Sequence, residues 1–183
     1  MEVSERELVN LLLGMLFGGF FLMALSGALI LQLDRSQAAP AEPPLWQKLF
    51  LFKLVALAWL AVLTGAYIIY PWYRAVAPSG ADLALYPKAL LLSRSSTAGW
   101  HNLGMEWKEH VAWIAPMAAT LVAYVMLKHR ALWNADRQIR AVILAFAFVA
   151  FFAAAIAGGW GAVIDKKAPV EGGRSIHLME SAK

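Results

Sequence analysis

Four stretches of the chain are apolar enough to form helices that cross a lipid bilayer, and they constrain the fold more than any other feature. They cover approximately residues 8–33, 49–70, 110–127 and 141–164. Each is close to the ~20 residues that a helix needs to cross the hydrocarbon core. We therefore expect an all-α integral membrane protein: a four-transmembrane-helix antiparallel bundle that forms a single domain over residues 1–183.

The composition agrees with this class of protein. Hydrophobic residues make up 61% and charged residues 15% of the chain, and the mean hydropathy is +0.59. A water-soluble fold would have to expose much of this apolar surface, whereas lipid accepts it directly. The chain has no cysteine, which excludes disulfides, thiolate metal sites and a cysteine nucleophile.

The charged residues indicate which partners the protein contacts and how it is oriented in a membrane. The basic residues are scattered rather than gathered into a stripe, so nucleic-acid binding is not expected. The net charge of +4 suits contact with anionic lipid headgroups. The short loop between the third and fourth apolar runs carries Lys128, Arg130, Arg137 and Arg140. Because short basic loops stay on the cytoplasmic side, we expect a bacterial inner (cytoplasmic) membrane, with both termini on the non-cytoplasmic side.

A long connector runs from Pro71 to Lys108, between the second and third apolar runs, and is expected to lie along the membrane surface. Tyr70, Trp72 and Tyr73 are expected to form an aromatic belt at the level of the lipid headgroups. Pro71 is expected to end the second helix. The segment ADLALYPKALLLSRSS is apolar enough to form a short interfacial helix.

The stretch WHNLGMEWKEHVAW, residues 100–113, places histidines, glutamates and tryptophans directly before the third apolar run. Helical steps of three and four residues align six chemically active side chains on one face. These are Glu106, His110, Trp113, Met117, Thr120 and Tyr124. Lipid cannot satisfy such groups, so this face is expected to point into the bundle, with Val111, Ile114, Leu121 and Val125 towards lipid. Pro116 is expected to disturb the helix beside His110.

Three kinds of cofactor would suit this stretch: haem b, a chlorin pigment and a quinone. The candidate binding residues are His110, Glu106, Trp113, His101 and Tyr70. A bis-histidine haem needs imidazoles from two helices, and the first, second and fourth apolar runs contain no histidine. In the alternative interpretation, His110 only pairs with Glu106, one turn away. A metal ion would use His110 and His101, although their spacing matches no known metal motif.

Small residues recur every four positions on two of the predicted helices. Gly14 and Gly18 form a GxxxG pair in the first helix. A similar ridge in the fourth helix consists of Ala150, Ala154, Gly158 and Ala162. Such ridges let helix backbones approach closely in lipid. They indicate either packing within the bundle or docking against a partner subunit.

These observations favour an integral membrane subunit of a larger energy-transducing complex, respiratory or photosynthetic, with a mainly structural or anchoring role. One alternative is an electron-transfer subunit that binds haem b, a pigment or a quinone near His110. The other is a small transporter or ion-pathway protein. No nucleotide-binding loop, nucleophile elbow or HExxH motif is present, so no catalytic activity of its own is expected. The expected partners are the lipid bilayer and other membrane-protein subunits.

Overall fold

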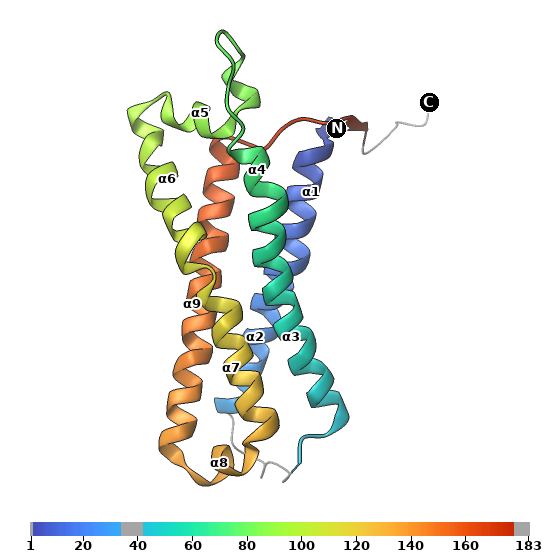
Figure 1. Cartoon of the computed structure of the whole chain (residues 1–183). Helices are drawn as coiled ribbons and strands as arrows, with labels where there is room; N and C mark the ends of the chain where they lie inside the picture. The colour runs from blue at the N-terminus through green and yellow to red at the C-terminus, as the bar shows by residue number, and fades with distance from the viewer. Residues whose placement is uncertain (1, 34–41, 178–183) are drawn as a thin grey trace.

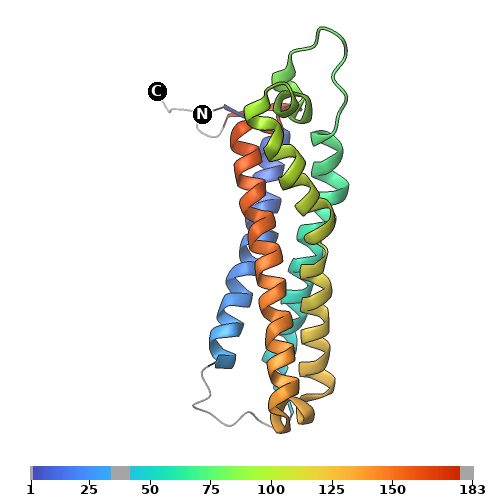
Figure 2. The same ribbon diagram turned by 90° about the vertical axis from the view of Figure 1, so that its left-hand side faces the viewer.

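The computed structural model describes residues 2–33 and 42–177, and most of these residues are helical. Four long helical segments lie side by side, and the chain direction alternates from one segment to the next (Figure 1). Each segment is long and apolar enough to cross a membrane, as the sequence predicts. The segments are Glu5–Ile30, Leu45–Tyr73, Ser95–Lys128 and Arg137–Lys167. A view turned by 90° shows the same elongated arrangement (Figure 2).

The first three segments each contain a π-helical element between two α-helices. The first segment contains α1 (Glu5–Leu13), the π-helical η1 (Gly14–Gly19) and α2 (Phe20–Leu33). The second contains α3 (Leu45–Thr64), the π-helical η2 (Gly65–Ile69) and α4 (Tyr70–Tyr73). The third contains α6 (Ser95–Glu106), the π-helical η4 (Trp107–Val111) and α7 (Ile114–Lys128). The fourth is α9 (Arg137–Lys167), which follows the short α8 (Arg130–Ala135).

Polar side chains fix the starts of the first and last helices. Oγ of Ser4 accepts a hydrogen bond from the backbone N–H of Glu7 at 3.2 Å. A carboxylate oxygen of Asp136 accepts bonds from the N–H groups of Gln138 and Ile139. Both caps satisfy donors that a helix start leaves without partners in its own backbone. Both helix starts therefore follow from local sequence.

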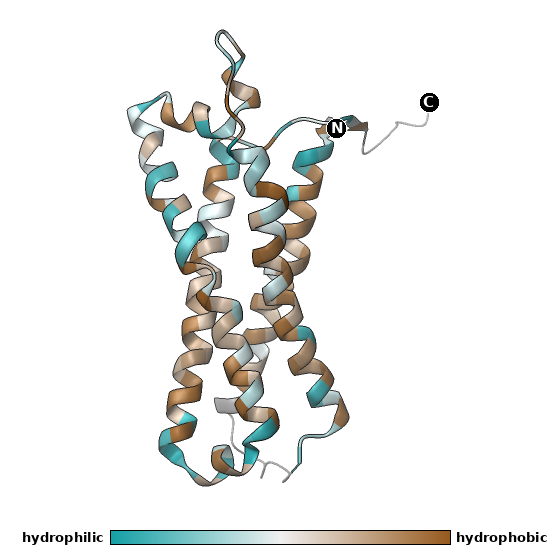
Figure 3. Cartoon of the chain, in the orientation of Figure 1, coloured by the Kyte–Doolittle hydropathy of each residue, from teal (hydrophilic) through white to brown (hydrophobic). Residues whose placement is uncertain are grey.

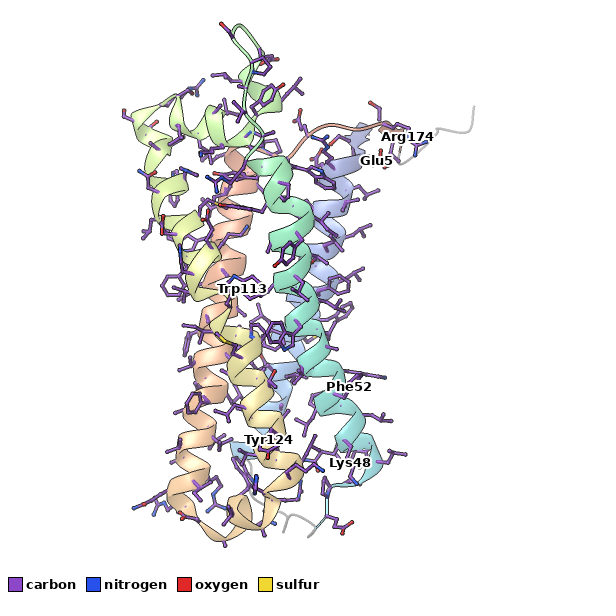
Figure 4. All side chains as sticks on the ribbon, in the orientation of Figure 1. Glu5, Lys48, Phe52, Trp113, Tyr124 and Arg174 are labelled. Carbon is purple, nitrogen blue, oxygen red and sulfur yellow. The ribbon has the colours of Figure 1, made fainter. Side chains whose placement is uncertain are left out.

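The two ends of the described chain meet in a short antiparallel sheet. Strand β1 (Glu2–Ser4) pairs with β2 (Ser175–His177). Just outside the sheet, Glu5 and Arg174 lie next to each other (Figure 4), and Nε of Arg174 is 3.7 Å from Oε2 of Glu5. The preceding turn requires Gly172, whose φ of 125° is rarely adopted by residues with a side chain. The sheet holds the start of the first segment near the end of the fourth.

The connector between the second and third segments is shorter than predicted. The third segment begins at Ser95, so only residues 74–94 remain between the two segments. These residues include the 3₁₀ turn η3 (Leu83–Leu85) and α5 (Pro87–Leu92), which lie at the same end of the molecule as the termini (Figure 1). The prediction that the whole stretch up to Lys108 lies along the surface is therefore wrong, because its second half is the helix α6.

Gly104 explains why α6 packs against α9. A Cβ atom at Gly104 would lie 3.0 Å from Cδ1 of Ile164 and 3.0 Å from Cε3 of Trp160. The absence of a side chain thus allows the close approach of the two helices. Trp100 adds an aromatic contact with Trp160, with the ring centroids 5.6 Å apart. These tertiary contacts extend the helix into a stretch that the apolar pattern alone assigns to a connector.

Proline explains two of the three π-helical elements of the described chain. Pro116 has no N–H group and therefore cannot bond to the carbonyl of Ala112. Just before it, the N–H of Ala112 bonds to the carbonyl of Trp107, five residues back, at 3.1 Å. Pro71 follows η2 in the same way, and the second segment continues through it. The predicted disturbance beside His110 is confirmed, whereas the prediction that Pro71 ends the second helix is wrong.

The third segment contributes most to the interior. In its most apolar 18-residue stretch 44% of the residues are buried, against 11% in the first segment. The buried face of α7 packs against α9 and α3 and consists mainly of small residues. These are Ala115, Pro116, Ala118, Ala119, Val122, Ala123 and Met126. Hydrophobic residues fill the middle of the bundle, while hydrophilic residues gather near its ends and along α6 and η4 (Figure 3).

Candidate functional site

The predicted site lies near the middle of the long axis of the molecule. Nε1 of Trp107 donates a hydrogen bond of 3.3 Å to the carbonyl of Ala153, which lies 16 residues after the start of α9 and 14 before its end. Nε1 of Trp59 donates a bond of 3.1 Å to Oγ1 of Thr120, and Trp59 lies 14 residues from each end of the second segment. The middle of the bundle thus falls between Trp107 and Thr120, a stretch that includes His110.

Most of the side chains that the sequence places on an inward face point outward instead. Glu106, His110, Met117, Thr120 and Tyr124 are all exposed. The hydroxyl of Thr120 accepts the hydrogen bond from Trp59 of the second segment. The predicted inward orientation is wrong for Glu106, His110, Met117 and Tyr124. The reason is that the alanine-rich face of α7 allows closer packing against α9 and α3 than a face of large polar side chains would.

Trp113, the remaining residue of that face, is separated from His110. It is half-buried and packs edge-to-face against Trp59, with the ring centroids 6.4 Å apart. It therefore lies between the third and second segments (Figure 4). Trp113 supports the packing of two helices and does not form a wall beside His110.

His110 pairs with Glu106 on its own helix. Nδ1 of His110 lies 3.3 Å from Oε2 of Glu106, and the two side chains are 70% and 72% exposed. The same nitrogen lies 3.1 Å from the backbone carbonyl oxygen of Glu106. This is the arrangement of the alternative interpretation, in which the two residues pair across one turn. Any group bound to His110 would have to lie on the outer surface of the third segment.

A second polar cluster, the tyrosine cluster, forms between the end of the second segment and α6. The hydroxyl of Tyr73, which is buried, lies 2.6 Å from Nδ1 of the half-buried His101. The two rings stack with their centroids 5.8 Å apart. Nη1 of Arg74 donates a bond of 2.8 Å to the hydroxyl of Tyr70, which also interacts with the carboxylate of Glu109. Two of the predicted residues, Tyr70 and His101, thus belong to this cluster, but through different partners: Tyr70 interacts with Arg74 and Glu109, and His101 contacts Tyr73.

A third polar cluster joins three segments at the same end of the bundle. Nδ2 of Asn10 donates a hydrogen bond of 2.8 Å to Oδ1 of Asp165. Lys108 extends towards Asp165 and interacts with it electrostatically. Its Nζ would lie only 3.4 Å from a Cβ at Gly161, so the glycine leaves room for the ammonium group beside α9. Asp165 is the third-last residue of α9. This cluster therefore lies at one end of the bundle and does not form a path across it.

Four consecutive side chains of the π-helical element η4 point in different directions and have different partners. Trp107 bonds to α9, Lys108 extends towards Asp165, Glu109 reaches Tyr70, and His110 faces outward. π-Helical elements are rare and are often found at functional sites. Sequence reasoning missed the electrostatic interaction of Lys108 with Asp165, because charged residues beside apolar runs usually mark helix ends. It also missed the contact of Tyr73 with His101, because this contact depends on the true start of the third helix.

The residues that could hold a metal ion do not converge. Among the residues that the structure describes, no three His, Asp or Glu side chains form a group suited to a metal. His101 and His110 have different partners, Tyr73 and Glu106. The binding of haem, pigment or quinone by the predicted residues stays a prediction. Comparison with known proteins found no matching family model, no matching curated protein and no matching solved structure.

Proposed function

We propose that this chain is an integral membrane subunit of a larger assembly, of the energy-transducing kind, with a mainly structural role. In this proposal its four long helices cross the bilayer as an antiparallel bundle. The outward face of the third segment, defined by Glu106, His110 and Met117, then contacts another subunit. We call these three residues the partner face.

The position of the Glu106–His110 pair carries this proposal. The pair is exposed on the outside of the chain and near its mid-length, in the stretch that would lie within the hydrocarbon region. A charged side chain at the centre of a spanning helix costs about 3 kcal/mol on insertion scales. Such residues face other helices or water-filled cavities rather than lipid. A partner subunit that covers the partner face would remove this cost.

The glycines of the first segment provide independent support. A Cβ added at Gly14, Gly18 or Gly19 would meet nothing within 4 Å. The GxxxG pair therefore does not serve close packing within this chain. Of the two interpretations of that ridge, docking against another helix is the one that the packing favours.

A quinone-binding electron-transfer role is the second candidate function, and the tyrosine cluster favours it. A quinone needs an aromatic wall and groups that accept or donate protons. Tyr73 and His101 offer a short hydrogen bond, with Glu109 as a nearby carboxylate. The test is extraction of the purified chain and measurement of bound quinone, together with an optical spectrum that would reveal a haem or chlorin.

Site-specific cross-linking tests the proposed subunit role. The chain has no cysteine, so Met117→Cys and Phe52→Cys each provide one attachment point for a photoactivatable maleimide in native membranes. Met117 is 53% exposed on the partner face. Phe52 is 71% exposed on α3 and points away from the bundle (Figure 4), so it serves as the control.

We expect Met117→Cys to form one adduct of discrete mass with a second protein, and Phe52→Cys to label mainly lipid. The same second protein should remain bound to the unmodified chain in native mass spectrometry. If Met117→Cys and Phe52→Cys both label only lipid, the partner face is a lipid-facing surface and the proposal fails.

A further inference from the structure

We propose that an apolar cavity at the α8 end of the bundle binds an acyl chain of an anionic membrane phospholipid. The cavity is lined by residues of α2, α3, α7, α8 and α9. Of these helices, α8 lies at the end of the molecule opposite α5 and the termini (Figure 1). The proposal does not depend on a partner subunit, because all of the cavity walls belong to this chain.

The cavity is enclosed almost entirely by hydrocarbon. Its volume is about 150 Å³, and among the 15 lining residues that the structure describes, Gln47 alone has a polar amide or charged side chain. Its lining includes Ala119 of α7, Ala147 of α9, and Leu51 and Leu54 of α3. Enclosed apolar cavities of about this size bind small apolar molecules such as benzene, and an apolar lining gives water few hydrogen-bond partners. The lining therefore selects a hydrocarbon ligand.

The volume decides which hydrocarbon fits. Sites for whole cofactors or drug-sized ligands measure roughly 300–1,000 Å³, so a cavity of about 150 Å³ is too small for a haem, a chlorin or a complete quinone. The end of one acyl chain is narrow enough to enter. Trp46 lines the cavity and is 65% exposed, so part of the cavity wall reaches the surface of the chain, where an acyl chain could enter.

Positive charge lies next to the cavity, because Arg130 bonds to the lining residue Gln47. Nη1 of Arg130 donates a hydrogen bond of 3.0 Å to Oε1 of Gln47. Burial lowers the pKa of Arg130 from its usual value, but a guanidinium group remains charged at neutral pH. The same end of the described chain carries Lys48, Lys128, Arg130, Arg137 and Arg140 against two acidic residues, Glu42 and Asp136. This balance favours an anionic headgroup over a zwitterionic one.

Trp133 gives a direct test in the full-length chain. It lines the cavity and is only 5% exposed, so lipid outside the bundle does not reach its ring. The chain is reconstituted in vesicles of phosphatidylglycerol with bromine atoms near the ends of the acyl chains, which quench tryptophan on contact. The emission of Trp133 is obtained by subtracting the tryptophan fluorescence of the Trp133→Phe variant from that of the wild type. We expect loss of this emission in the brominated vesicles relative to unbrominated ones.

A pair of alanine variants on α9 tests the location. Ala147→Phe fills the cavity, whereas Ala145→Phe adds the same ring two residues away at an exposed position. We expect Ala147→Phe to abolish the quenching of Trp133 and Ala145→Phe to leave it unchanged. If the larger residue at position 147 prevents folding, the wild-type measurement still decides whether acyl chains reach Trp133.

The headgroup is tested with two other quenchers. We expect brominated phosphatidylcholine to quench Trp133 less than brominated phosphatidylglycerol at equal mole fraction. Free brominated fatty acid, added to unbrominated vesicles, distinguishes a site for a free amphiphile from a site for a membrane lipid. Unquenched Trp133 in brominated phosphatidylglycerol overturns the proposal, as does equal quenching in the Ala147→Phe and Ala145→Phe variants.

Discussion

A hydrogen bond between the hydroxyl of Tyr73 and Nδ1 of His101 joins the second and third segments. The Tyr73 side chain is 3% exposed, and its hydroxyl has the imidazole of His101 as its neighbour at 2.6 Å. A buried hydroxyl without a partner is costly, so this bond specifies how the two helices meet. The same geometry would allow a proton to move between the two side chains, as the quinone-binding candidate requires.

We expect Tyr73→Phe to lower the free energy of unfolding in detergent by about 1–3 kcal/mol, because it leaves a nitrogen of His101 without its partner. Tyr67→Phe is the matched control, since the side chain of Tyr67 is 72% exposed. Its free energy of unfolding should change by less than about 0.5 kcal/mol. Denaturant titrations of both variants provide the measurement, and equal stability of the two would contradict a structural role for the bond.

The packing of α6 against α9 depends on glycine. Gly104 and Gly99 lie on the same helix in different surroundings. A Cβ at Gly104 meets Trp160 and Ile164 at 3.0 Å, while a Cβ at Gly99 meets nothing within 4 Å. The first glycine is required by the neighbouring helix, and the second only adds flexibility to the unfolded chain.

The substitutions Gly99→Ala and Gly104→Ala should therefore change stability in opposite directions. Alanine is favoured over glycine in a helix by about 1 kcal/mol, so Gly99→Ala should raise the free energy of unfolding. At Gly104 the added methyl group should cost about 1–3 kcal/mol through overpacking against Trp160 and outweigh that gain. Thermal unfolding followed by circular dichroism measures both. A stabilised Gly104→Ala variant would show that α6 and α9 separate easily.

The sequence predicts the elements of this fold better than their orientation. Apolar runs of sufficient length identify all four long segments. The reason is that the free energy of transferring a helix into lipid depends mainly on the residues of that helix and not on the helices beside it. The start of the third segment at Ser95 depends on contacts with α9, which a single sequence does not contain. In the same way, the period of 3.6 residues shows that Glu106 and His110 share a face but not whether that face or the alanine face is buried.

The residues of the predicted site lie in two separate places for a related reason. Tyr70 and His101 enter one cluster because Tyr73, three residues after Tyr70, meets His101 at one level of two antiparallel helices. That register depends on the length of the connector between the segments, which is shorter than the apolar pattern predicts. Glu106 and His110 depend only on helical spacing, and their predicted pairing is confirmed.

The two ends of the whole molecule differ in structure and in charge. One end carries the terminal sheet, α5 and the three-residue turn η3, and the other carries α8 and the connection from α7 to α9 (Figure 1). Basic residues are concentrated at the α8 end over residues 128–140. In a membrane protein this asymmetry sets the orientation, because basic residues in short loops are retained in the cytoplasm.

Cysteine accessibility tests the orientation, since the chain has no cysteine of its own. Ser79→Cys lies in the connector before α5, and Asn134→Cys lies in α8; both positions are exposed. With the α8 end in the cytoplasm, a membrane-impermeant maleimide should label Ser79→Cys in intact spheroplasts and label Asn134→Cys only after permeabilisation. The reverse pattern would place the termini in the cytoplasm. Labelling of both positions in intact, impermeable spheroplasts would rule out a chain whose two ends lie on opposite sides of the membrane.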